Sequence, residues 1–306
     1  MCPSRTSRIA GDRVDVLRPG LERLYESFNY PESALDPVQI VRRYPHVADR
    51  EVIAYIAAGL AFGRVASVMA SVEAVSAVLG PSPAMFLRTF EPDRDGAPLL
   101  PLVHRWTRGR DFVALLWMLR ALVERHGSLE AAVAGGLDAS TVDVGPAIER
   151  FSSLARAVDL RPVYGRRVPA NPGAFYFFTR PSTGSACKRM NLFLRWMARR
   201  DQVDPGGWTM VARRQLIVPL DTHTIRAGKC LGLTRRTSPG WKMATDITNA
   251  LRRIDPDDPV RYDFALCHLS MMGACGWQTS RGDSQCPLRG VCRPRSNASR
   301  RRTRQR

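Results

Sequence analysis

The sequence has few acidic residues and almost no signs of β-structure, of a membrane span or of export. Its 306 residues include 28 Asp and Glu against 46 Lys and Arg, a formal net charge of +18. The longest apolar run, residues 52–62, is too short to span a bilayer, and the first residues lack the apolar stretch of a secretory signal. The five histidines show no triad or HExxH spacing, and no nucleotide-binding glycine motif occurs. We therefore expect a soluble cytoplasmic protein outside the common nucleotide-binding enzymes.

The residues that are present indicate a folded, strongly basic, helical protein. A hydrophobic fraction of 44% is too high for a wholly disordered chain. The basic excess therefore belongs to a folded protein and makes polyanions the leading class of partner. Apolar residues recur at spacings of three and four along most segments, which predicts an all-α fold. Helices are expected at residues 17–28, 64–79, 107–126, 146–158, 186–200, 222–231, 241–254 and 259–272. The helix at 64–79 is expected to be of a buried type.

Asp221 stands at the predicted start of a helix, in the segment LIVPLDTHTIRAGKCLGL (216–233). An apolar run and a proline lead into it. An aspartate there accepts backbone N–H groups as an N-cap and stabilises the helix by roughly 1 kcal/mol. The same carboxylate, if it faces a cleft, is held in one rotamer and can also act on a substrate. The two interpretations are compatible.

Lys188 lies in the first turn of another predicted helix, in the segment PSTGSACKRMNLFLRWM (181–197). The turn before it leads to a helix N-terminus, whose backbone N–H groups form a good phosphate cradle. The positive end of the helix dipole disfavours a protonated amine there, and a lysine nucleophile must be unprotonated. The alternative is a surface lysine that contacts phosphate beside Arg189. The core face of this helix is expected to be Met190, Phe193, Leu194 and Met197.

Four of the seven cysteines, Cys267, Cys275, Cys286 and Cys292, gather near the C-terminal end. In a chain without an export signal, such a cluster favours a metal or iron–sulfur site over disulfides. Four thiolates can hold a four-iron cluster or a tetrahedral zinc ion. The alternative is that some of these cysteines are small buried apolar residues without a metal.

The two helix-start segments resemble motifs of one family. LDTHTIR resembles the V-D-T-H-V-x-R signature of the helix-hairpin-helix-GPD DNA glycosylases, the endonuclease III superfamily, and PSTGSACKRMN is similar to their hairpin, P-G-x-G-x-K-T-A. The resemblance implies that Asp221 assists departure of a damaged base and that Lys188 is a Schiff-base nucleophile. It also implies a four-iron four-sulfur cluster at the terminal cysteines. More narrowly, KRMNLFLRWM with PLDTHTIR resembles a branch known only as a domain of unknown function.

The sequence departs from that family at several positions. Ser182 replaces the first hairpin glycine, and Lys188 falls late relative to the turn. The interval from Lys188 to Asp221 is longer than in endonuclease III, with residues 201–208 as an apparent insertion. An archaeal oxoguanine-glycosylase branch has a similarly long interval, which raises oxidised purines as a substrate. Among the cysteine intervals, only the one from Cys286 to Cys292 agrees with the family pattern.

The resemblance implies two helical lobes with a basic DNA-binding cleft between them. We expect a central lobe with the hairpin at 50–212 and a second lobe made of 17–49 and 213–292. Residues 1–16 and the arginine-rich tail 293–306 are expected to be flexible. The expected DNA-contacting residues are Arg64, Gly184, Ser185, Arg189, Thr222, His223 and Arg226.

The function that follows is excision of a damaged base from double-stranded DNA by a monomeric, nucleoid-associated enzyme that binds no membrane. Such an enzyme must flip its target base out of the duplex. If Lys188 reaches the sugar, a Schiff base and AP-lyase activity follow. One alternative is a monofunctional glycosylase in which Asp221 activates water. Another is a non-catalytic DNA-binding module on the same fold.

Overall fold

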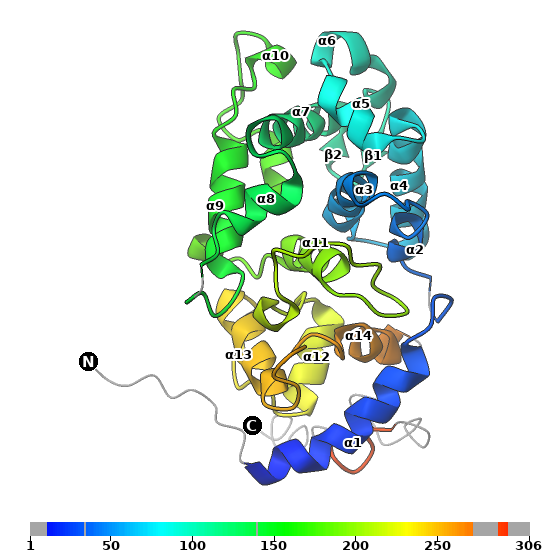
Figure 1. Ribbon diagram of the computed structural model, residues 1–306, viewed down its shortest axis with the longest axis vertical. Helices are drawn as coiled ribbons and strands as arrows, with labels where there is room; N and C mark the ends of the chain where they lie inside the picture. Colours follow the sequence, from blue (N-terminus) through cyan, green and yellow to red (C-terminus); the bar gives the residue numbers. More distant parts are fainter. Residues whose placement is uncertain (1–10, 34, 139, 272–286, 293–306) are drawn as a thin grey trace, which may run out of the picture. The chain divides into compact units, whose positions relative to one another are not determined.

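The computed structural model describes residues 11–33, 35–138, 140–271 and 287–292, and these fold mainly into helices (Figure 1). The all-α prediction is confirmed; one two-stranded antiparallel sheet is present in the described part of the chain. The chain divides into two compact units. The central unit is Leu35–Gln215, and the terminal unit combines Met1–Ala34 with Leu216–Arg306. The cleft expected between two lobes stays a prediction.

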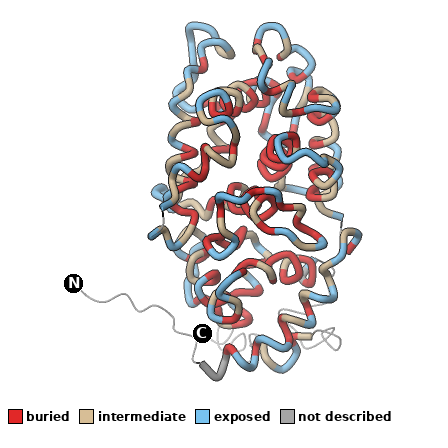
Figure 2. Tube along the Cα trace, in the orientation of Figure 1, coloured by how far each residue is buried: buried red, intermediate tan, exposed pale blue. Residues whose placement is uncertain are grey.

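The central unit is built around one buried helix, α3 (Val47–Leu60), in which every residue from 51 to 60 is buried (Figure 2). Helices α11, α5, α2, α4 and α8 pack against it. The other elements of the unit are α2 (Val38–Val41), α4 (Val65–Leu79), α5 (Pro83–Thr89), α6 (Pro92–Asp95), η1 (Ala97–Leu99), β1 (Val103–His104), β2 (Thr107–Arg108), α7 (Gly109–His126), α8 (Leu129–Ala134), α9 (Gly145–Arg156), α10 (Arg161–Tyr164), η2 (Gly173–Phe177), η3 (Pro181–Thr183), α11 (Lys188–Ala198) and η4 (Arg213–Gln215).

The burial predicted from the sequence is correct for α11 and wrong for α4. The predicted core face of α11 is confirmed, because Met190, Phe193, Leu194 and Met197 are all buried. The expectation of a buried-type helix at 64–79 is wrong. Helix α4 buries one face only, since valines at positions 68, 72 and 75 return to the same side of a 3.6-residue helix. The fully buried helix is α3, which precedes it.

The terminal unit contains α1 (Gly11–Phe28), α12 (Thr222–Cys230), α13 (Trp241–Arg252) and α14 (Asp263–Met271). Leu17, Leu21 and Leu24 form the buried face of α1, which packs against α14. Helix α1 begins at Gly11, so residues 11–16, which the sequence assigns to a flexible N-terminal segment, are helical. Val14, which is 8% exposed, extends the same apolar spacing by one turn. Residues 1–10 and the tail 293–306 lie outside the described residues.

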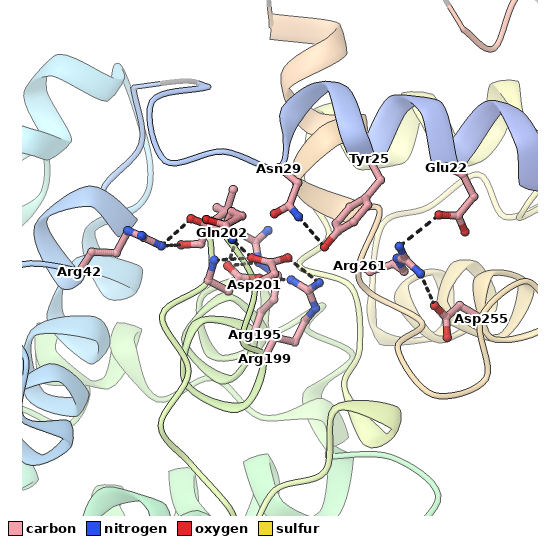
Figure 3. Close-up of polar contacts among 12 residues, drawn as sticks. Glu22, Tyr25, Asn29, Arg42, Arg195, Arg199, Asp201, Gln202, Asp255 and Arg261 are labelled. Atoms are coloured by element: carbon pink, nitrogen blue, oxygen red, sulfur yellow. Dashed lines mark hydrogen bonds and ion pairs between the residues drawn. The ribbon is translucent and has the colours of Figure 1, made fainter.

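The guanidinium group of Arg261 links α1 to the segment between α13 and α14 in the terminal unit. Arg261 forms ion pairs with Glu22 on α1 at 3.1 Å and with Asp255 at 3.0 Å (Figure 3). Its guanidinium also lies 4.3 Å from the centre of the Tyr25 ring. Tyr262 donates its hydroxyl proton to Glu22, and burial raises the pKa of this phenol. These contacts hold α1 on residues more than two hundred positions away in the sequence.

The boundary between the units differs from the predicted lobes at the first crossing. Residues 35–49 belong to the central unit, although the sequence predicts that 17–49 belongs to the other lobe. The reason is that α2 packs on α3, and α3 itself begins at Val47. Arg42 adds a polar contact, donating to the carbonyls of Gln202 and Val203 within the same unit.

The apparent insertion at 201–208 is an integral part of the central unit. Asp204 is fully buried and pairs with Arg195 at 3.1 Å and with Arg199. Arg199 also pairs with Asp201 at 2.9 Å, and Asp201 accepts the backbone N–H groups of residues 203 and 204 (Figure 3). Burial raises the pKa of Asp201, but Arg199 and these N–H groups outweigh it, so the net shift is downward. Two helical arginines thus fold this loop onto α11.

The end of the same loop is anchored on α3. The indole N–H of Trp208 donates to Glu51 at 3.2 Å, and the ring packs edge-on against Phe193. Arg50 donates to the carbonyl of Gly206 at 2.8 Å. The loop therefore joins α11 to α3 through buried polar contacts, which is why it is not a surface insertion.

Among the described residues, no single helix is long and apolar enough to cross a membrane. Helices α4 and α5 meet the length and composition criteria as a pair, but they are bent by 63° at the break between them.

The buried pairs of Asp204 generate a stability prediction. Asp204→Asn leaves two buried guanidinium groups facing a neutral amide, so we expect a loss of about 3–5 kcal/mol in the free energy of unfolding. The urea midpoint, followed by tryptophan fluorescence, measures it. The matched control is Glu73→Gln, which breaks the exposed Arg43–Glu73 pair and should leave the midpoint nearly unchanged. Equal midpoints for Asp204→Asn and the native protein would contradict the assigned role.

Candidate functional site

Asp221 caps α12 in the terminal unit, as its position in the sequence predicts. Its Oδ1 accepts the backbone N–H groups of His223 and Thr224, each at 2.8 Å. The side chain is half-buried. Two backbone donors and the positive end of the helix dipole stabilise a carboxylate at this position. The cap fixes the rotamer and directs Oδ2 away from the helix end.

The second carboxylate oxygen of Asp221 meets a cysteine from α14. Cys267 Sγ lies 3.4 Å from Asp221 Oδ2 and 3.9 Å from the sulfur of Met271. The contact with Oδ2 requires a protonated thiol, because a thiolate and a carboxylate at this distance repel each other. Ligation of a metal by Cys267 therefore requires this contact to break.

The remaining cysteines do not complete a metal site in the described part of the chain. Cys275 and Cys286 lie outside the described residues, and Cys292 is half-buried. Among the described residues, no group of three or more His, Cys, Asp and Glu side chains could hold a metal ion. The four-iron four-sulfur cluster and its zinc alternative stay predictions.

The outer side of α12 carries the predicted DNA-contacting residues of this unit. Thr222 and Arg226 are exposed, and their spacing of four places them on one helix face together with exposed Lys229. His223 is half-buried. On the opposite side, Gly228 packs against Ile247 of α13 so closely that a Cβ would lie 2.6 Å from that side chain. One face of α12 is thus packed, and the other presents two cations.

The hairpin-like turn before α11 is a 3-10 turn, η3, followed by left-handed residues. Gly184 has φ +80° and is exposed, and Ser185 accepts the backbone N–H of Cys187. Ser182 donates its hydroxyl and its N–H to Glu149, so a fixed side-chain contact holds this turn. Cys187, the N-cap of α11, has φ +48°, and burial raises the pKa of its thiol.

Lys188 reaches away from the turn toward α3. Its Nζ donates to the carbonyl oxygen of Ala61, at the C-terminal end of α3, at 3.1 Å. The sequence placed this amine at the positive end of a helix dipole. The structure instead places its nitrogen at the C-terminal end of another helix, α3. The residue lies at the start of α11, but its Nζ contacts the end of α3.

Arg189 does not extend to solvent as a phosphate contact would. Its guanidinium lies over the ring of Tyr176, 3.3 Å from the ring centre, and 6.0 Å from the centre of Phe62. Its Nη1 is buried and has no hydrogen-bond partner among the described residues. Burial lowers the pKa of this guanidinium. Arg189 thus belongs to an aromatic cluster that sequence reasoning missed.

This Trp106 cluster consists of Phe62, Trp106, Tyr176 and Arg189. Phe62 stacks on Trp106, with ring centres 4.7 Å apart and planes 22° apart, and Tyr176 meets both rings edge-on. Of the aromatic run 175–178, Phe177 and Phe178 are core residues, whereas Phe175 and Tyr176 are only half-buried. The sequence gives little indication of this cluster. Trp106 lies between β1 and β2, and two-residue strands are too short to show an alternation of apolar and polar residues.

The imidazole of His104 fixes the position of Phe62. Its Nε2 lies 3.2 Å from the carbonyl oxygen of Phe62, and its Nδ1 lies 2.8 Å from Ser71 Oγ. The ring also packs edge-on against the Phe62 ring at 4.6 Å. Burial lowers the pKa of His104, so the ring is neutral near pH 7. The loop after α3 therefore brings Arg64, Lys188 and the Trp106 cluster to one end of that helix.

The cap geometry of Asp221 generates a prediction about stability. Asp221→Ala removes the acceptor of two backbone N–H groups and should lower the free energy of unfolding by about 1 kcal/mol, whereas Asp221→Asn should leave it nearly unchanged because asparagine caps as well as aspartate. Thermal and urea midpoints of the two variants measure the difference. Equal losses in both variants would mean that charge, and not capping, holds the helix start.

Comparison with known proteins places the chain in one family and adds no named relative. No curated protein and no solved structure matches the chain. A family model described as "Protein of unknown function (DUF2400)" matches residues 36–272, which is well over half of the chain. The match includes Lys188, Asp221 and Cys267 but ends before the other three clustered cysteines. The chain therefore belongs to the DUF2400 family.

Proposed function

We propose that the protein is a DNA glycosylase that excises a damaged base, with Asp221 as its catalytic residue. The observation that carries the proposal is the geometry of this carboxylate: Oδ1 is held by two backbone N–H groups, and Oδ2 points away from the helix end toward Cys267. The likeness of LDTHTIR to the glycosylase signature supports the same assignment. An oxidised purine is the proposed substrate class.

The chemistry assigned to Asp221 is hydrolysis of the N-glycosidic bond. As that bond breaks, the electron pair leaves with the base, which takes up a proton from solvent, and positive charge develops on the sugar. A fixed carboxylate stabilises this charge. Water then adds to the sugar carbon and loses its proton to Asp221. The base must be unstacked before this step, at a cost of a few kcal/mol that damage to the base reduces.

The contact of Lys188 favours the monofunctional form of the reaction. The Nζ of Lys188 donates to the carbonyl of Ala61, so the amine must leave this contact before it can attack the sugar. We therefore assign to Lys188 a structural role at the end of α3 and to Asp221 the activation of water. Exposed Thr222 and Arg226 on α12 are the proposed phosphate contacts.

A second candidate function, a non-catalytic DNA-binding module, rests on a different observation. The thiol of Cys267 occupies Asp221 Oδ2, the oxygen that the reaction needs. If this contact persists when DNA is bound, the carboxylate cannot receive a proton from water. Cys267→Ala removes the thiol and keeps the cap, so it separates the two functions.

The enzyme proposal predicts the behaviour of Asp221→Asn. This variant keeps the helix cap but cannot take up a proton or stabilise positive charge, so excision should fall at least about a hundredfold. DNA affinity should stay within about twofold of the native value. Single-turnover reactions on duplexes bearing oxidised, alkylated or deaminated bases measure excision, and fluorescence anisotropy measures DNA affinity. Absence of excision in both the native protein and Cys267→Ala would support the module and contradict the enzyme.

The role of Lys188 generates a separate prediction. Borohydride reduces a Schiff base to a stable amine, so a lysine nucleophile would leave the protein covalently attached to DNA. We expect no such product from the native protein on damaged or abasic duplexes. Trapping that Lys188→Gln abolishes, and that Lys229→Gln does not, would overturn the monofunctional assignment. Lys229 is the matched control because it is exposed and donates to the carbonyl of Thr237.

A further inference from the structure

Trp106 offers an aromatic face to solvent while its other face is covered. It is 55% exposed, although large aromatic side chains are usually well buried in folded proteins. One side of the indole stacks on Phe62, with ring centres 4.7 Å apart. The Tyr176 ring packs against the indole at 85°, with ring centres 5.3 Å apart. The indole is therefore held rigidly, with its outer face toward solvent. A rigid aromatic face is a surface on which another flat ring can stack.

The hairpin that carries Trp106 keeps an unfavourable backbone conformation. Arg105 has φ +56° and stands first of the two residues that connect β1 to β2. Two-residue hairpin turns of this kind favour glycine at that position, because side chains strain a left-handed backbone. Gly63 accommodates the resulting side chain: a Cβ on it would lie 2.6 Å from Arg105 Nε. An arginine here places a cation directly beside the exposed indole.

The charges around the indole determine which aromatic ligand fits. Arg105 is exposed next to it, Arg64 is exposed at the start of α4, and Arg189 lies on Tyr176. Lys188 reaches the residue before Phe62. A cationic ligand, such as an alkylammonium group, would be repelled by this set. A flat ring attached to negative charge is attracted, and a nucleobase on its phosphate backbone has that chemistry.

We propose that the outer face of Trp106 binds an unpaired nucleobase of a DNA strand, with Arg105 and Arg64 at the flanking phosphates. A base within a duplex has both faces stacked on its neighbours, so the ligand is a single-stranded or locally melted segment. The inference rests on the proposed function only in taking DNA as the polyanion. It uses no residue of the Asp221 site.

The test compares two strands of equal charge that differ in their bases. One is an oligothymidylate of about eight nucleotides, and the other has the same backbone with base-free spacers at every sugar. Binding is measured by anisotropy for the native protein and for Trp106→Leu, which keeps apolar cover over Phe62. We expect about a tenfold loss for the thymidylate, the effect of one base–aromatic stack, and less than a twofold change for the base-free strand. Trp106→Phe should retain most of the affinity.

Two controls keep the experiment interpretable. Trp117→Leu alters a half-buried tryptophan elsewhere in the central unit, whose indole N–H donates to the carbonyl of Asp159, and should change neither affinity. Arg105→Gly removes the cation from a position that favours glycine. It should weaken binding of both strands and raise the thermal midpoint.

Each remaining outcome contradicts the inference. An unchanged thymidylate affinity in Trp106→Leu, or an equal loss for both strands, would overturn stacking at Trp106. Unchanged affinities in Arg105→Gly would overturn the phosphate contact. Failure of the proposed function is read separately: a native protein that excises no base, yet binds the thymidylate through Trp106, would refute the enzyme and leave this site in place.

Discussion

The burial of α3 on all sides is the constraint on which the central unit depends. A helix buried over residues 51–60 must satisfy every polar group that it carries, and it carries the carboxylate of Glu51. That carboxylate accepts the N–H groups of Leu129 and Glu130 at the start of α8 and the indole N–H of Trp208. Burial still raises its pKa, so the three donors only partly compensate for the lost water. Helix α8 and the loop 201–208 are positioned by this requirement.

The C-terminal end of α3 imposes a second requirement, which places the basic and aromatic residues. The carbonyl groups past the last turn have no partner within the helix. The carbonyl of Ala61 receives Lys188, and that of Phe62 receives His104. Because His104 fixes Phe62, the stack of Trp106 on Phe62 has a rigid base. The cluster proposed to bind a nucleobase is thus a consequence of terminating a buried helix.

The sequence predicted what depends on local spacing and missed what depends on distant partners. The 3.6-residue period located the main helices, and a capping motif located Asp221, because both signals lie within a few residues. The environment of Lys188 depends on the carbonyl of Ala61, 127 positions away, and no local signal encodes that contact. Comparison with endonuclease III makes residues 201–208 look like an insertion. Their role comes from pairing with Arg195 and Arg199, which is visible only in three dimensions.

The loop 201–208 and the Trp106 cluster differ in backbone strain and in the pairing of their buried polar groups. The buried carboxylates of the loop 201–208 are paired with Arg195 and Arg199. The Trp106 cluster has the opposite character: Arg105 holds a left-handed backbone, Arg189 Nη1 is buried without a hydrogen-bond partner among the described residues, and Trp106 is exposed. Each of these features lowers stability in the unbound protein. The left-handed Arg105, the unsatisfied Arg189 nitrogen and the exposed indole lie together at this end of α3, and their combination supports a binding role there.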